Sequence, residues 1–149
     1  MKLNDDDLEW ITHCFQLSRR YLDLSMTQAQ ADLLNREDLC TGISALLRSS
    51  PRAQVRLLID GYDPTTLSQH RLMALARRTP SRISLRLIND HPEWPAHTCF
   101  LGDHRAGWQI PGRQPLRRIN DAAEARKMAE RFERLWKAGT ESPDFRLLN

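Results

Sequence analysis

The sequence is poor in the residues that mark secreted, membrane-spanning or disulfide-stabilised proteins. Its three cysteines, Cys14, Cys40 and Cys99, lie far apart in 149 residues and form no CxxC pair. An odd number of isolated cysteines indicates free thiols and no thiolate metal site. No apolar stretch approaches the ~20 residues of a membrane span, and the acidic N-terminus MKLNDDDLEW is unlike a signal peptide. We therefore expect a cytoplasmic protein that makes no membrane contact.

Lysine is almost absent as well. Only Lys2, Lys127 and Lys137 accompany the arginines among 22 basic residues. GC-rich codon usage explains such a bias, and so does recognition of phosphate, which suits the planar fork of arginine. The net charge is +3 and the pI is near 9. With 28% charged and 40% hydrophobic residues, the composition is that of an ordinary globular domain.

The hydrophobic period switches between about 3.6 and 2 along the chain, which predicts alternating helices and strands. Crossover helices join parallel strands, and a closing hairpin adds antiparallel ones. We therefore predict an α/β fold, a mixed sheet of about five strands sandwiched by helices. The expected helices cover residues 4–20, 36–49, 67–78 and 121–137, and the expected strands cover 21–26, 53–60, 82–89, 97–103 and 105–111. Residues 1–139 are predicted to form one domain, followed by a C-terminal tail, 140–149.

The last predicted helix has a clear start, face and end. Asp121 stands where an N-cap is expected, and Gly139 stands where a C′ glycine belongs. Phe132, Leu135 and Trp136 fall on one apolar stripe. We predict that this stripe packs on the sheet as core.

His97 and Asp103, in the predicted hairpin, are the candidates for chemistry. A carboxylate can orient a histidine that acts as nucleophile or base. The alternative is that His97 opens a strand and Asp103 opens a turn, as expected in any protein with five histidines. His91 has no metal-binding spacing to His97 or His104, so we expect no metal and no cofactor.

The hairpin region departs from a known catalytic pattern. His97 is followed by Cys99, by Asp103 and, on the return strand, by IPGR at residues 110–113. With the order of elements, residues 8–138 resemble half of a phospholipase D-like domain. In that superfamily a histidine attacks phosphorus, a lysine two residues later binds phosphate, an aspartate follows, and two halves combine into one site. Here Cys99 replaces the lysine, Asp103 comes one residue early, and IPGR replaces the glycine-serine region. The resemblance implies the fold without an intact catalytic motif.

Three longer stretches carry a second resemblance. AQVRLLIDGYDP, HRLMALARRTPSRISLRL and AEARKMAERFERLWKAG are similar to uncharacterised bacterial domains that are often fused behind a GNAT-type acetyltransferase. None of the three is a catalytic motif, and the chain has no acetyltransferase glycine-rich turn. This resemblance therefore implies a fold and no acetyl-CoA chemistry.

Arginines from neighbouring segments predict a basic patch, with tryptophans as stacking surfaces for bases. The alternative is a solvated helix end, with arginine stems packed along the sheet. The patch would comprise Arg52, Arg56, Arg77, Arg78, Arg82 and Arg86. The residues we expect to bind a ligand are Arg82, Arg86, Trp94, Arg105, Trp108 and Arg113.

The sequence thus favours a non-catalytic phospholipase D-like module that binds a protein partner or a phosphorylated ligand. One alternative is a divergent phosphodiesterase or nuclease that uses His97, with an arginine replacing the missing lysine. Another is a nucleic-acid-binding domain that uses the arginine patch. A homodimer is also expected, because half-domains of the resembled superfamily pair about a two-fold axis. Trp94, Phe100 and Trp108 would supply an aromatic interface.

Overall fold

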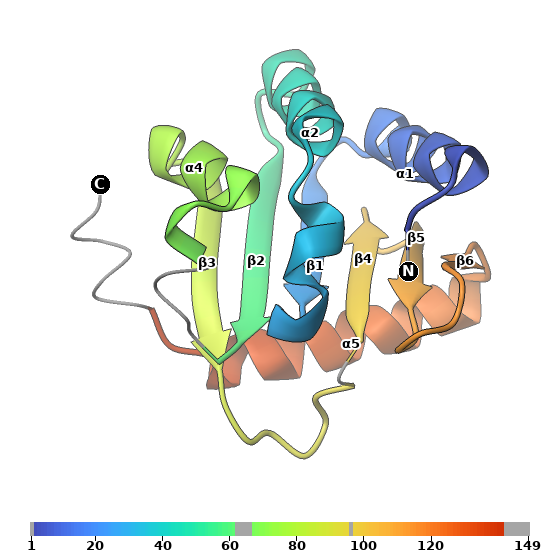
Figure 1. Cartoon of the computed structure of the whole chain (residues 1–149), viewed down its shortest axis with the longest axis vertical. Helices are drawn as coiled ribbons and strands as arrows, with labels where there is room; N and C mark the ends of the chain where they lie inside the picture. Colours follow the sequence, from blue (N-terminus) through green and yellow to red (C-terminus); the bar gives the residue numbers. More distant parts are fainter. Residues whose placement is uncertain (1, 62–66, 96, 142–149) are drawn as a thin grey trace.

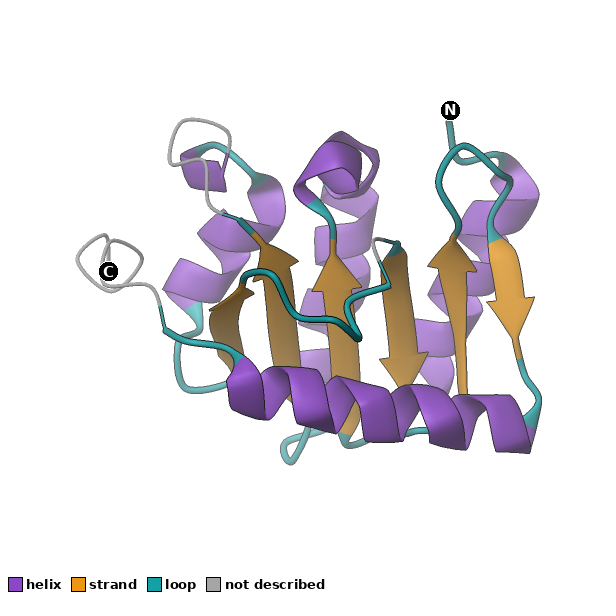
Figure 2. Cartoon of the chain, turned by 90° about the horizontal axis from the view of Figure 1, so that it is seen from below, coloured by secondary structure: helices purple, strands orange, loops and turns teal. Residues whose placement is uncertain are grey.

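A computed structural model describes residues 2–61, 67–95 and 97–141. It shows one mixed sheet with helices on both faces (Figures 1 and 2). The predicted α/β fold is therefore confirmed. The elements are, in order, α1 (Asp5–Leu17), β1 (Tyr21–Met26), the 3₁₀ helix η1 (Gln28–Leu34), α2 (Glu37–Ser49), β2 (Gln54–Asp60), α4 (Arg71–Arg78), β3 (Ile83–Ile88), β4 (Thr98–Gly102), β5 (Ala106–Ile110), β6 (Arg117–Ile119) and α5 (Ala122–Ala138).

The sheet has six strands in the order β3-β2-β1-β4-β5-β6. β1, β2 and β3 are parallel, as short crossovers through α2 and α4 require. β4 pairs antiparallel with the other side of β1, and β5 and β6 follow as antiparallel neighbours. The amino ends of β1, β2 and β3 therefore lie beside the β4–β5 turn, at the top of Figure 1. This row of strand ends is one edge of the sheet, and the row at which β1, β2 and β3 end is the opposite edge.

The two faces of the sheet are covered unequally. α1, α2 and α4 cover one face, and α5 alone crosses the other (Figures 1 and 2). Leu22, Leu24 and Met26 of β1 point into the larger core under the three helices. On the opposite face Phe132, Leu135 and Trp136 of α5 are buried against the sheet, as predicted.

Sequence patterning missed two elements and misread one glycine. The segment after β1, predicted as a connection, is η1, and the loop after β5 contains the three-residue strand β6. Gly139 is extended, with φ −74° and ψ 159°, and so is not a left-handed C′ glycine. A Cβ there would lie 3.1 Å from Arg86 Cβ and 3.2 Å from Leu87 O. A side chain there would be crowded, because the chain leaving α5 runs close against β3.

Side chains cap the helices where they begin. Asn4 and Asp7 form a capping box at α1, and Asp121 accepts the N–H of Glu124, which confirms the predicted N-cap of α5. α4 begins at Arg71, later than predicted, after the buried His70. His70 Nδ1 accepts the N–H of Leu72, and Nε2 lies 2.8 Å from Ala31 O.

The C-terminal region is described only in part. Thr140, the first residue of the predicted tail, pairs with Leu87 at the β3 edge through two backbone hydrogen bonds of 2.7 and 2.8 Å. Residues 142–149 lie outside the described residues. No helix in the described part of the chain combines the length and the apolar character that crossing a bilayer requires.

Candidate nucleic-acid interface

The two residues suggested for chemistry lie at opposite edges of the sheet. His97 directly precedes β4, and Asp103 directly follows it, so the whole strand separates them. A five-residue strand spans roughly 16 Å, which is far beyond hydrogen-bond reach. Among the described residues, buried Nδ1 of His97 has no hydrogen-bond partner. The Asp103 carboxylate therefore cannot orient the His97 ring, and the two residues do not form a catalytic pair.

Asp103 has a structural task instead. It adopts a left-handed conformation with φ 50° in the β4–β5 turn. Its carboxylate accepts three consecutive backbone N–H groups, those of Arg19 at 2.7 Å, Arg20 at 2.8 Å and Tyr21 at 2.9 Å. These bonds fix the path of the chain between α1 and β1, beside the turn.

Four of the six residues expected to bind a ligand are committed to the fold. Trp108 is 1% exposed and lies in the core. Arg82 donates to three backbone carbonyls, those of Leu47, Ser50 and Ala53, and so ties the end of α2 to the sheet. Arg86 donates to Trp136 O at the end of α5 at 2.7 Å. Trp94 Nε1 donates to Asp60 at 3.0 Å.

Arg105 and Arg113, the other two, are exposed. Arg105 is in the β4–β5 turn, whereas Arg113 follows β5 at the opposite edge of the sheet. The six residues therefore form no common site.

Arginines gather instead at the sheet edge that carries the amino ends of β1, β2 and β3. Five segments meet there: the α1–β1, α2–β2, α4–β3 and β6–α5 connections and the β4–β5 turn (Figure 1). Their two carboxylates are both engaged by backbone N–H groups: Asp103 by three, and Asp121 by that of Glu124. We name this surface the arginine edge, and its members are Arg19, Arg20, Arg48, Arg52, Arg77, Arg78, Arg82 and Arg105.

The opposite edge of the sheet has the reverse charge. The segments there are 27–38, 60–61, 67–71, 88–95 and 111–116. Their arginines are Arg36, Arg71 and Arg113, and Arg36 is paired with Asp38 at 2.9 Å. The carboxylates of these segments are Asp32, Glu37, Asp38, Asp60, Asp90 and Glu93. The sheet therefore separates charge between its two ends.

Helix dipoles explain part of the arginine edge. Arg48 lies in the last turn of α2, and Arg77 and Arg78 lie in the last turn of α4, where cations are favoured. Arg20, Arg52 and Arg105 have no such reason to be there. Within the described residues, none of the eight guanidinium groups forms an ion pair with a carboxylate. Arg19, Arg77 and Arg82 donate to backbone carbonyls of the protein. The other five, which are exposed and make no described side-chain hydrogen bond, are free to bind an external anion: Arg20, Arg48, Arg52, Arg78 and Arg105.

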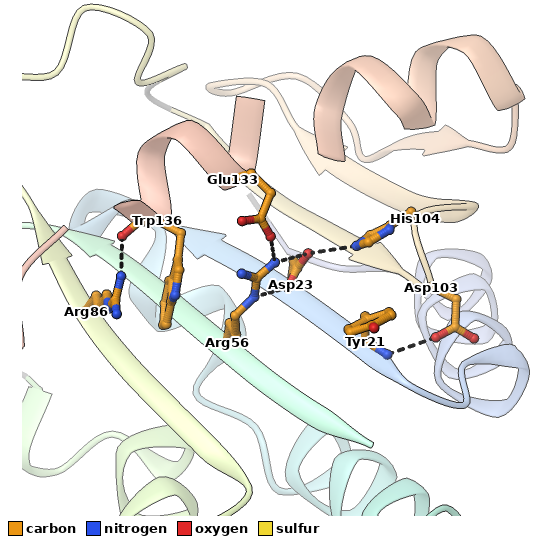
Figure 3. Close-up of polar contacts among 8 residues, drawn as sticks. All are labelled: Tyr21, Asp23, Arg56, Arg86, Asp103, His104, Glu133 and Trp136. Atoms are coloured by element: carbon orange, nitrogen blue, oxygen red, sulfur yellow. Dashed lines mark hydrogen bonds and ion pairs between the residues drawn. The ribbon is translucent and has the colours of Figure 1, made fainter. Parts of the chain in front are cut away.

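An aromatic pair lies at the corner of the arginine edge. Tyr21, at the start of β1, stacks on His104, with ring centroids 5.0 Å apart and an interplanar angle of 7°. Tyr21 is 38% exposed, and the Arg20 guanidinium lies 5.5 Å from its ring centroid. Figure 3 shows the Tyr21 ring next to the His104 ring, with the Asp103 carboxylate bonded to the Tyr21 backbone beside them. Stacked rings beside arginines are the combination that nucleic-acid sites use.

Behind this pair, a charged network joins the sheet to α5 (Figure 3). Arg56 of β2 makes a bidentate contact with the buried Asp23 of β1, at 2.9 and 3.1 Å, and a second ion pair with Glu133 of α5. The Arg56 guanidinium also lies over the rings of Phe132 and Trp136, at 5.0 and 5.3 Å. Arg56, expected in the basic patch, is thus an internal anchor of α5.

The network shifts the pKa values of its members. The hydrogen bond from Arg56 lowers the pKa of Glu133. Burial opposes the charge of Arg56, but its hydrogen bonds to the two carboxylates raise its pKa overall. Burial raises the pKa of Asp23, even with Arg56 beside it. His104 Nε2 lies 3.7 Å from Asp23 and forms an ion pair with it when protonated.

Other reactive side chains are inert where the structure describes them. Burial raises the pKa of the Cys14 thiol to about 12 and also raises the pKa values of Cys40 and Cys99. Burial lowers the pKa of His70, so its imidazole is neutral. The described residues contain no group of three or more His, Cys, Asp or Glu side chains placed to hold a metal ion.

Comparison with known proteins gives a family. A family model described as a domain of unknown function, DUF7931, matches residues 4–148. The chain belongs to this family. None of the curated proteins matches the chain.

The fold of this DUF7931 domain is also found among solved structures. One of these is that of TrmBL2, an archaeal chromatin protein with a novel mode of DNA binding, and it superposes with a TM-score of 0.62 at 10% identity. The alignment covers 88% of this chain and 48% of TrmBL2, so the chain spans about half the length of that protein. The likeness shows the fold alone.

Proposed function

We propose that this DUF7931 domain is a non-catalytic module that binds nucleic acid through the arginine edge. The observation that carries the proposal is the set of eight arginines on one sheet edge, five of them exposed and without a described side-chain hydrogen bond, with no available carboxylate among them. Contacts to phosphate supply most of the affinity in non-specific nucleic-acid binding, and arginine is well suited to make them. The stacked Tyr21 and His104 rings add an aromatic surface at the corner of that edge.

The separation of His97 and Asp103 supports a non-catalytic role. Phosphoryl transfer needs positive charge beside the nucleophile, and the side chain two residues after His97 is the buried Cys99. Cys99 is uncharged, because burial raises its pKa. The phospholipase D-like ancestry implied by the hairpin sequence stays a prediction.

The other expected partners have less support. Phe100 and Trp108 are 2% and 1% exposed, so they cannot form the aromatic homodimer interface that we predicted from the sequence. A small phosphorylated ligand would need a few arginines converging on one point, whereas these eight are spread along a sheet edge. The DNA-binding activity of TrmBL2 is consistent with the proposal, although the shared half of that protein does not by itself specify where DNA binds.

The test is a binding titration with a fluorescein-labelled DNA duplex of about 20 base pairs, followed by anisotropy at low salt. We expect the wild-type protein to bind, and a triple variant, Arg20→Ala with Arg52→Ala and Arg105→Ala, to bind about tenfold more weakly or worse. These three arginines are exposed and make no described hydrogen bond through their side chains, so the variant should fold normally.

The control removes three exposed arginines from other surfaces: Arg113→Ala, Arg71→Ala, which loses hydrogen bonds to Asn35, and Arg134→Ala, which loses an exposed ion pair with Glu93. It changes the net charge by the same amount and should leave the affinity nearly unchanged. Equal weakening by both triple variants would show that net charge alone drives binding. If the wild-type protein bound neither this duplex nor a single strand of the same length, the proposed function would be refuted.

A further inference from the structure

We propose that the hollow between the β4–β5 turn and α5 holds an unstacked base, so that the domain prefers single-stranded to double-stranded nucleic acid. The proposal rests on the proposed function and specifies the form of its ligand. The hollow opens beside the arginine edge, and Arg105 belongs to both. Its lining residues are His104, Arg105, Asn120, Ala122, Arg126, Ala129, Glu130 and Glu133.

The turn forms one wall of the hollow. His104 is held in a left-handed conformation with φ 60°, and Tyr21 covers one face of its ring. The imidazole side chain is 41% exposed and borders the hollow. A ring that is backed by a second ring and open to a hollow provides a platform on which a base can stack.

α5 forms the other wall. Ala122, Arg126, Ala129 and Glu133 recur at helical spacing, so they lie on the face of α5 that borders the hollow. The two alanines are small and leave room for a planar group. Arg126 is exposed and, like Arg105 opposite, forms no ion pair with a described carboxylate. A backbone phosphate could therefore be held between these two arginines.

The polar side chains on the helix side of the hollow favour binding of a base over binding of a phosphate. Glu130 and Asn120 line the hollow, and so does Glu133, whose carboxylate is already paired with Arg56. Carboxylates repel phosphate, but with an amide they can accept and donate hydrogen bonds at the edge of a base. Because a base within a duplex is stacked and paired, only a single strand or a flipped nucleotide can present it here.

The test compares three labelled probes: a 15-nucleotide oligo(dT), an abasic oligomer with the same phosphates, and a hairpin duplex. We expect oligo(dT) to bind about tenfold more tightly than the abasic oligomer, the range of one or two base–aromatic stacks. His104→Asn should remove that difference. Asn tolerates the left-handed backbone, and His13→Asn, on the exposed face of α1, is the matched control.

The NMR signals of the His104 ring give an independent readout. Adding oligo(dT) should shift them upfield, and adding the abasic oligomer should not. Equal affinity for all three probes, with no effect of His104→Asn, would overturn this inference and leave the proposed function standing. Failure of every probe to bind would overturn both.

Discussion

At the scale of single residues, Asp103 was predicted as a candidate catalytic residue, and the structure shows that it anchors the backbone. Its turn position places one carboxylate within 2.7–2.9 Å of three consecutive backbone N–H groups. Hydrogen bonds to a charged group are worth more than neutral ones, and a left-handed conformation suits Asp better than Ala. Asp103 therefore holds Arg19, Arg20 and Tyr21 where the arginine edge needs them.

We predict that Asp103→Ala lowers the free energy of unfolding by about 2 kcal/mol, measured by urea melts. Asp103→Asn should lower it by about half as much, because Asn keeps an acceptor oxygen and tolerates the left-handed backbone. A loss below ~0.5 kcal/mol for Asp103→Ala, the range of an ordinary surface substitution, would show that the three contacts do not anchor the loop.

The sequence could not reveal this role. The spacing from His97 to Asp103 is compatible with a catalytic pair, and only the straight path of β4 shows that the two lie at opposite edges. Similarly, the sequence suggested Trp94 and Trp108 as surfaces on which a base could stack. Trp108 is buried in the core, and Trp94 donates a hydrogen bond to Asp60. Long-range neighbours decide whether an aromatic or an arginine is free to bind a ligand.

At the scale of elements, α5 is attached to the sheet through charge as well as through its apolar stripe. Arg56 contacts Asp23 and Glu133 and stacks under Phe132 and Trp136. Arg86, 4.5 Å from the Trp136 ring centroid, closes the end of the helix. One helix must shield this whole face, and these contacts specify where it lies.

We predict that Arg56→Met costs about 3 kcal/mol of unfolding free energy at pH 7, because it leaves Asp23 buried without its partner. The cost should shrink as the pH falls towards 5. The cause is the raised pKa of Asp23: as the pH falls, protonation of this buried carboxyl favours the fold, more so in the variant, where Arg56 no longer stabilises its charge. The pKa of Glu133 is lowered, so its contribution is lost only at a more acidic pH than this window covers.

The control for this pH dependence is Arg134→Met, which breaks the exposed ion pair with Glu93. Exposed pairs contribute little, so its cost should stay near zero at both pH values. A cost of Arg56→Met that is equal at pH 5 and pH 7 would contradict the role given to buried Asp23.

Elements with strong periodicity were predictable from the sequence, and short ones were not. Five strands and the helix stripe of α5 were recovered because each repeats its apolar residues several times. β6 has three residues, and only Ile119 is buried, so no pattern could develop. η1 places only Ala31 and Leu34 in the core, which is too few to indicate a helix.

At the scale of the whole molecule, the main feature is the separation of charge between the two ends of the sheet. The net charge of +3 conceals it, because the carboxylates of the opposite edge offset the arginine edge. The sequence shows that arginines cluster just before strands or between them, in residues 17–21, 46–54, 75–83 and 102–106. It does not show that these four segments are neighbours, because that follows only from the strand directions in the folded sheet.

The most direct test of the account is the salt dependence of duplex binding. Each phosphate contact contributes a slope of about −0.9 to log Kobs against log salt concentration. The variant lacking Arg20, Arg52 and Arg105 should therefore have a slope shallower than that of the wild-type protein by about 2–3. The control variant lacking Arg71, Arg113 and Arg134 should keep the wild-type slope. Identical slopes for all three proteins would show that nucleic acid does not contact the arginine edge.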